Sequence, residues 1–163
     1  MKTVNDLSPL TKVWIYQSDK ELSAAQLNIL SELSGVFLQN WESHGKPVNG
    51  TIQVFYNRFI VFFIDEQDEQ ACGRCVDASV RFTKELEQEL NVTLLDRMQV
   101  AYRKNEKIVS CTLAEFEKLI EKGGIGEHTT VFNNTVHSLT EFKTKWEVPL
   151  KDSWHARYLP VKK

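Results

Sequence analysis

The chain has 163 residues, of which 42% are hydrophobic and 26% charged, and its net charge is −2 at pH 7. This length supports one domain with a sizeable core, and the composition is typical of a globular protein rather than of a disordered one. The small negative charge gives no global field that would attract nucleic acid or an anionic membrane, and the longest apolar run, Phe59–Ile64, is too short to span a bilayer.

The first elements are a strand and a helix. Residues 11–17 (TKVWIYQ) are rich in β-branched and aromatic side chains, which favour a strand. A capping box of Ser23 and Gln26 then opens a helix with apolar residues at helical spacing. The glycine and proline within residues 43–50 end this helix.

Residues 51–56 and 59–66 predict a hairpin, because two strand-like runs are joined at Asn57-Arg58. The second run is apolar on both faces, since residues 59–64 include no polar side chain. A strand of this kind is covered on both faces in a folded protein. We therefore expect the C-terminal part of the chain, or a second subunit, to cover the face that the helices leave open.

The second half of the chain alternates helices with short strands. A helix is expected at about residues 76–91, followed by a second hairpin around Asn105. Thr112 and Ser138, each followed three residues later by a glutamate, open two shorter helices. A short strand is expected between them at residues 129–133. The remaining aromatic tail is expected to be ordered but irregular, because its aromatic side chains need burial.

Together these elements predict an α+β protein. The first six run β-α-β-β-α-β, the order of the ferredoxin-like sandwich, in which two helices cover one face of an antiparallel sheet. We expect a single domain over residues 1–163, with a ferredoxin-like core at about 11–104. A C-terminal helical extension at about 105–163 would pack on the other face of that sheet.

The stretch EQACGRCVDASVRF is the preferred place for a functional site. Gly73 permits a tight turn before the predicted helix, and the N–H groups there, together with Arg74, favour a small anion. Cys75 or Ser79 would supply a nucleophile, and Asp77 would orient a base. The competing interpretation is structural, because a carboxylate such as Asp77 in the first turn stabilises the helix dipole.

Residues elsewhere in the chain would complete this site. His44 or His155 would act as the base, and Trp154 would close over a bound ligand. Such partners meet only in space, so no spacing in the sequence tests them. We expect no cofactor and no metal ion, and the expected partner is a small anionic ligand. The residues leave open whether the protein is an enzyme or only binds this ligand.

Cys72 and Cys75 form a C-x-x-C pair, which allows two other interpretations. A redox pair of the thioredoxin kind follows a strand, whereas an acidic linker precedes these cysteines. Structural zinc needs two further ligands, and neither Cys111 nor any histidine is paired at ligand spacing. Cys111 is expected to be a small buried residue. The odd number of cysteines and the lack of an apolar leader favour a cytosolic protein without a disulfide framework.

Six blocks distributed over nearly the whole chain are VWIYQ (13–17), WESHG (41–45), NRFIV (57–61), GRCVDASVRF (73–82), VFNN (131–134) and WEVPLKDSWHARYL (146–159). Together they resemble a family of small bacterial proteins that are catalogued as ABC transporter ATPases. The family's central motif is similar to Gly-Cys-Ser-Ile-Asp. Its first and last residues fall on Gly73 and Asp77, whereas its cysteine falls on Arg74 and its serine on Cys75. The catalogue name implies a P-loop, but no G-x-x-x-x-G-K-[ST] occurs here, so we expect no ABC-type ATPase.

Two functions of other classes stay open. A protein-interaction module would form a homodimer through the second apolar face of residues 59–64. An RNA-binding module of the RRM kind has the same element order and would stack bases on strand aromatics. It ranks last, because the run NRFIVFFI lacks the RRM glycines and the chain is slightly acidic. A ligand site predicts a pocket that joins residues 73–79 to a histidine, a dimer predicts a flat apolar patch, and RNA binding predicts exposed aromatic residues beside arginine and lysine.

Overall fold

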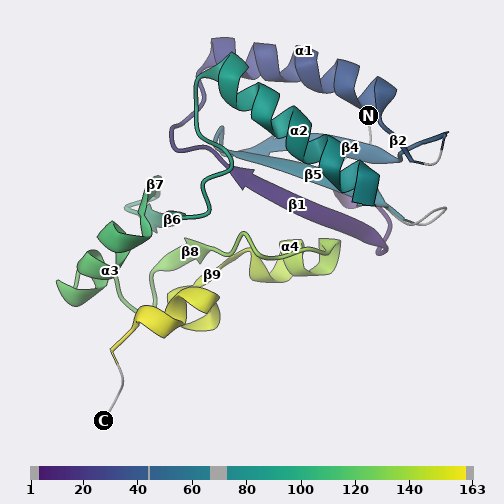
Figure 1. The fold of residues 1–163 in the computed structure, drawn as a ribbon. Helices are drawn as coiled ribbons and strands as arrows, with labels where there is room; N and C mark the ends of the chain where they lie inside the picture. Colours follow the sequence, from purple (N-terminus) through teal and green to yellow (C-terminus); the bar gives the residue numbers. More distant parts are fainter. Residues whose placement is uncertain (1–3, 44, 67–72, 161–163) are drawn as a thin grey trace.

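The protein has the α+β architecture that the sequence predicts. The computed structural model describes residues 4–43, 45–66 and 73–160. Within this part of the chain there are four α-helices, two larger antiparallel sheets and one short two-stranded ribbon. In Figure 1 the two long helices lie on one side of the first sheet, and the C-terminal elements lie on its other side.

The α-helices are α1 (Ala24–Asn40), α2 (Gly73–Leu90), α3 (Leu113–Glu121) and α4 (Leu139–Lys145). The strands are β1 (Thr11–Gln17), β2 (Glu42–Ser43), β3 (Lys46–Pro47), β4 (Gly50–Phe55), β5 (Phe59–Asp65), β6 (Gln99–Lys104), β7 (Lys107–Thr112), β8 (Thr130–Phe132) and β9 (Glu147–Pro149). Three 3₁₀ helices complete the set: η1 (Val4–Asp6), η2 (Leu150–Asp152) and η3 (Trp154–Tyr158).

The first sheet has the strand order β1-β5-β4 and carries α1 and α2 on one face. The predicted capping box opens α1, because the Ser23 side chain accepts from the Gln26 N–H and the Gln26 side chain accepts from the Ser23 N–H. Ile60, Phe62 and Ile64 of β5 point toward these helices and form a core with them. α2 begins at Gly73, three residues before the predicted start, so Asp77 lies in its second turn.

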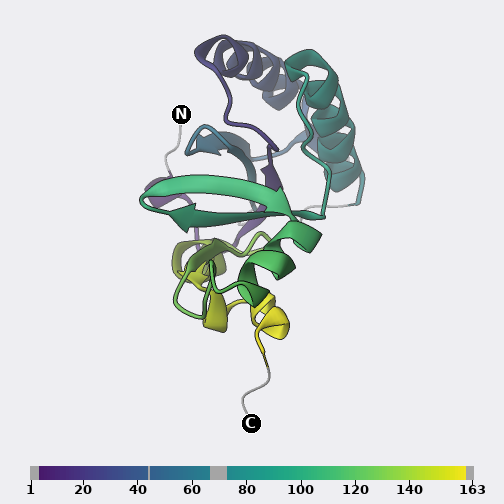
Figure 2. The same cartoon turned by 90° about the vertical axis from the view of Figure 1, so that its left-hand side faces the viewer.

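The second sheet has the order β7-β6-β8-β9 and packs against the opposite face of β5. Phe59, Val61 and Phe63 meet a cluster that includes Phe132 of the second sheet and Trp146 at the end of α4. The outer face of the second sheet packs on α3 and on the 3₁₀ turns. Figure 2 shows the β6–β7 hairpin, in green, between the long helices and the C-terminal elements. Helices, sheet, sheet and helix are therefore stacked in four layers.

The predicted ferredoxin-like sheet is incomplete, because its fourth strand lies elsewhere. β6, the last strand of the predicted core, belongs to the second sheet and does not pair with a strand of the first. The physical reason is that β6 is apolar on both faces: Ala101 faces the core between the sheets, and Val100 and Tyr102 face the core under α3. The segment before α4 reaches the second edge of β1, where the Val13 N–H donates to the His137 carbonyl at 3.0 Å.

Candidate ligand-binding cleft

A cleft of about 710 Å³ lies along β1. β1 lines it from residue 13 to residue 17, and α2 contributes Val76 and Val80. The α2–β6 connection, the segment from residue 132 to residue 137 and the pair Trp154–His155 form the remaining walls. A cavity of this size suits a small organic ligand.

The main chain of β1 forms one wall of the cleft through its second edge. The Ser18 N–H donates to the Arg58 carbonyl, so in β1 the even-numbered residues turn their N–H and C=O groups toward β5. By this alternation the odd-numbered residues turn their N–H and C=O groups to the other edge of the strand; these are Val13, Ile15 and Gln17. Val13 bonds to the segment before α4. The main-chain groups of Ile15 and Gln17 therefore face the cleft side of the strand.

Three polar side chains form a connected chain at this wall. The indole Nε1 of Trp146 donates to Asn134 Oδ1 at 3.0 Å, and Asn134 Nδ2 donates to Gln17 Oε1 at 2.8 Å. Gln17 is 6% exposed, and its remaining group, Nε2, is buried with no hydrogen-bond partner in the described part of the protein. This amide nitrogen is a donor with no acceptor.

Trp154 supplies a second buried donor at the cleft. Its Nε1 is covered from water and has no partner among the described residues. The indole stacks on the His155 ring with the ring centres 3.8 Å apart, and the Arg157 guanidinium lies 5.9 Å from the indole centre. Two other buried atoms share this lack of a partner, Thr11 Oγ1 and Ser34 Oγ, but neither residue lines the cleft.

His155 lines the cleft but is nearly fully buried, with 1% of its surface exposed. Its Nδ1 shares a 2.7 Å hydrogen bond with the Ser153 hydroxyl, and its ring packs edge-on against Phe116. Burial lowers the pKa of His155 to about 4, because the charged imidazolium loses its hydration. The imidazole is therefore neutral at pH 7. Ser153 does not line the cleft, so this pair is not placed as a nucleophile and its base.

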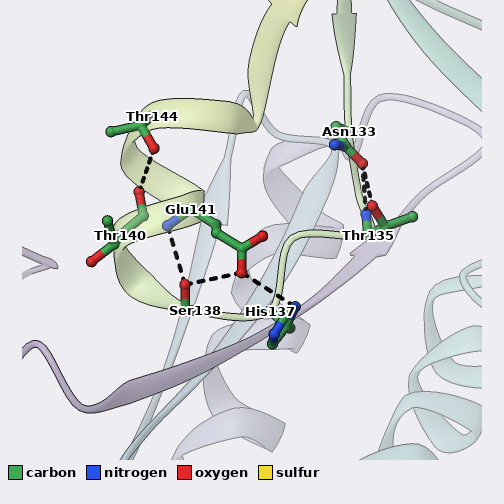
Figure 3. Close-up of polar contacts among 7 residues, drawn as sticks. All are labelled: Asn133, Thr135, His137, Ser138, Thr140, Glu141 and Thr144. Atoms are coloured by element: carbon green, nitrogen blue, oxygen red, sulfur yellow. Dashed lines mark hydrogen bonds and ion pairs between the residues drawn. The ribbon is translucent and has the colours of Figure 1, made fainter. Parts of the chain in front are cut away.

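Asn134 lies in the segment between β8 and α4, and Figure 3 shows polar contacts of its neighbours in this segment and in α4. Asn133 Oδ1 accepts from both the N–H and the hydroxyl of Thr135, which fixes a turn. Ser138 caps α4 by accepting from the Glu141 N–H, as the sequence predicts. The exposed His137 lies 3.3 Å from the Glu141 carboxylate. Arg97, an exposed cation, lines the cleft from the α2–β6 connection.

The residues predicted at the start of α2 are not brought together in a site. Cys75 is fully buried in the core, where its thiol lies 3.9 Å from the Glu42 carbonyl and its own carbonyl accepts from the Trp41 indole. The Ser79 hydroxyl is buried and donates to the Val76 carbonyl. Asp77 is exposed. None of these three lines the cleft, although Val76 between them does.

The other predicted residues divide between the cleft and the undescribed positions. Trp154 and His155, predicted to close the site and to act as its base, both line the cleft. His44 lies outside the described residues, and so does the side chain of Arg74. Gly73 is the first residue of α2, whose opening turn the Trp41 indole contacts through the Cys75 carbonyl.

The structure also bears on redox and metal chemistry. Cys72 lies outside the described residues, and the Cys75 thiol has no exposed surface. Burial raises the pKa of the Cys111 thiol to about 11, so this thiol is protonated and unreactive at pH 7. Across residues 4–43, 45–66 and 73–160, no group of three histidine, cysteine, aspartate or glutamate side chains could hold a metal ion.

Three residues of the β1 wall were not identified from the sequence, because they are far apart in the chain: Gln17, Asn134 and Trp146. Gln17 and Asn134 are 117 positions apart and meet only through the packing of the two sheets. The available signal was a glutamine directly after the apolar and aromatic residues 13–16 of the predicted strand, together with the VFNN block.

Protein-family models, characterised proteins and solved structures were compared with the chain, and none of them matches. In the described part of the chain, no helix combines the length and the apolar character needed to cross a membrane.

Proposed function

We propose that this protein binds a small, largely apolar ligand that carries an oxygen acceptor, and that the cleft beside β1 is its site. The observation that carries this proposal is the pair of buried nitrogen donors without partners, Gln17 Nε2 and Trp154 Nε1, on residues that line one cavity. Asp96 and Arg97 both line this cavity, so their charges balance and the buried donors, rather than charge, specify the acceptor.

The energetic reason is the cost of leaving such donors unpaired. A buried donor without an acceptor costs about 1–3 kcal/mol, because it has lost its bond to water and gained none. Folded proteins retain few of these groups. A ligand oxygen that reaches Gln17 Nε2 or Trp154 Nε1 recovers part of this cost. The apolar walls, which include Val13, Val80 and Phe132, would bury the remainder of the ligand.

The test is to block the cleft and to measure binding of a simple probe. Val80 is half-buried and lines the cleft from α2, so Val80→Phe extends a ring into it. Val36→Phe makes the same change at an exposed valine of α1 that does not line the cleft. Phenylacetate, followed by nuclear magnetic resonance titration, should bind the unmodified protein and Val36→Phe but not Val80→Phe. Equal binding to both variants would place the site elsewhere.

A second candidate function is homodimer formation through the outer edge of β4, which pairs with no further strand in the described part of the chain. The face of β5 first considered for a dimer is covered by Phe132 and Trp146 of the same chain. β4, in contrast, is an edge strand without charge, proline or bulge, the features that usually block edge pairing. An antiparallel edge is complementary to itself about a two-fold axis, so the occupant would be a second copy. Light scattering of Val54→Lys against the unmodified protein tests this, because a charge on β4 should produce a monomer.

RNA binding stays the lowest-ranked alternative: Tyr56 is exposed beside the Arg103 guanidinium, as that function requires, but the strand that was expected to stack bases gives it no support. Phe59–Ile64 are buried on both faces, so this strand offers no aromatic side chain to a base. We further propose that β1, β4, β5, α1 and α2 form a ferredoxin-like unit without its fourth strand. Membership in the small bacterial family that the six blocks resemble, and a cytosolic location, belong to the same proposal. ATP hydrolysis does not, because the chain has no P-loop.

A further inference from the structure

The hydrogen bonds that link Trp146, Asn134 and Gln17 at the β1 wall can run in only one direction. An indole N–H can only donate, so the Asn134 atom that faces Trp146 must be its oxygen. The Asn134 amide nitrogen then faces Gln17 at 2.8 Å, and the Gln17 atom that meets it must also be an oxygen. The Gln17 nitrogen is therefore the atom of this amide without a partner. Turning either amide around would set N–H against N–H or oxygen against oxygen.

The assignment of oxygen and nitrogen in an amide is normally read from such partners, and here one donor-only group fixes two amides in series. Gln17 itself is chemically ambivalent, since its carboxamide both donates and accepts. The orientation of the Gln17 amide is determined through Asn134 by the Trp146 indole, which follows the last residue of α4.

We propose that the hydrogen-bonded relay from Trp146 through Asn134 to Gln17 makes the cleft selective for ligands that accept a hydrogen bond, and that Trp146 sets this selectivity without lining the cleft. The ligand class is an organic acid, or its ester or amide, with an apolar body. This inference rests on the proposed function of the cleft. An ammonium ligand is rejected, because its N–H groups would face the Gln17 nitrogen and the Trp154 indole.

The relay can be reversed by one isosteric change that leaves Gln17 in place. In Asn134→Asp, one carboxylate oxygen still accepts from Trp146, but the other now faces Gln17. The Gln17 amide must then turn to donate its nitrogen, which places its oxygen where the unpaired nitrogen lies in the unmodified protein. The matched control is Asn133→Asp, which adds the same charge one residue away. Asn133 Oδ1 only accepts, from Thr135, so an aspartate there preserves its contacts.

Three probes with one phenyl body separate charge from hydrogen-bond direction: phenylacetate, its neutral methyl ester and phenethylamine. In the unmodified protein we expect the acid and the ester to bind about tenfold more tightly than the amine. Asn134→Asp should weaken the ester about tenfold and strengthen the amine, whereas Asn133→Asp should leave the affinity for the ester within about twofold. The Gln17 side-chain amide protons should shift downfield only in Asn134→Asp, because they gain a carboxylate acceptor.

The outcomes distinguish this inference from the proposed function. If the probes bind in the cleft but the ester is indifferent to Asn134→Asp, or responds equally to Asn133→Asp, the relay does not set selectivity and the inference is wrong. If no probe binds the unmodified protein, the proposed function is wrong, and the inference, which rests on it, is wrong as well. Should Asn134→Asp not fold, Gln17→Glu offers a second route, since it keeps an acceptor toward Asn134 and presents an acceptor to the cleft.

Discussion

The start of α2 and the cleft beside β1 differ in how they are built. At the start of α2, glycine, cysteine, aspartate and serine are adjacent in the sequence, yet packing separates them: Cys75 enters the core and Asp77 faces solvent. In the cleft, Gln17, Asn134 and Trp154 are far apart in the sequence, yet packing places them around one cavity. A local cluster of reactive residue types is therefore weaker evidence for a site than buried donors that lack partners.

The largest expected effect concerns the core role of Cys75. A carboxylate at this fully buried position would be an unpaired charge in the core beneath α1 and α2. Cys75→Asp should therefore reduce the free energy of unfolding by about 3–5 kcal/mol at pH 7, as measured by urea denaturation. A loss below about 1 kcal/mol would mean that the start of α2 is open to solvent and would restore it as a candidate site.

The next effect is the pH dependence that His155 contributes. Its pKa is 6.5 in the unfolded chain and about 4 in the folded protein, so below pH 6.5 the unfolded chain binds the proton more readily. The stability from neutral His155 is fully present above pH 6.5 and is lost as the pH falls toward about 4, by about 3 kcal/mol in total.

His155→Phe keeps a ring against Phe116 and Trp154 but removes this titration. Urea denaturation at a series of pH values should give a shallower slope for the variant than for the unmodified protein between pH 6.5 and 4. The carboxylates titrate in both proteins, so the difference between the two curves isolates His155. Parallel curves would show that His155 is hydrated and exposed to the cleft solvent.

A smaller effect is expected from the Gln17 donor. Gln17→Met keeps the length of the side chain and removes its hydrogen-bonding groups, so the ligand oxygen loses one donor. Phenylacetate should bind about tenfold more weakly, which corresponds to about 1.4 kcal/mol. Calorimetric titration of both proteins measures the difference, and an unchanged dissociation constant would remove Gln17 from the site.

The smallest effect is expected at Asp77. This carboxylate is exposed, lies in the second turn of α2 and forms no ion pair with another described residue. Asp77→Ala should change the free energy of unfolding by no more than about 0.5 kcal/mol and should leave phenylacetate binding unchanged. A clear loss of binding with stability intact would move the site back to the start of α2.

Local features of the fold could be predicted from the sequence, because short-range rules determine them. The cap of α1 at Ser23 and the turn between β6 and β7 at Asn105 follow from residue type alone. The two apolar faces of β5 indicated a cover on each side, and both sides are covered.

The position of β6 and the three residues of β9 could not be predicted in this way. The residue pattern of β6 fits a position in either sheet, so it does not indicate which one the strand joins. β9 has three residues, too few for a periodic pattern. The cleft follows from the position of β6, because it occupies the edge of β1 that β6 leaves free. Of its residues, Trp154 and His155 were predicted from type, whereas Gln17 and Asn134 required the contact between the sheets.

The most direct test of the account is a chemical-shift map of phenylacetate binding on the uniformly ¹⁵N-labelled protein. The cleft predicts that the largest changes fall on the Trp154 indole N–H, the Gln17 side-chain amide and the main-chain amides of Ile15 and Gln17, all of which belong to residues that line it. Changes centred on residues 73–79, or no changes at all, would contradict the assignment of the site to the cleft.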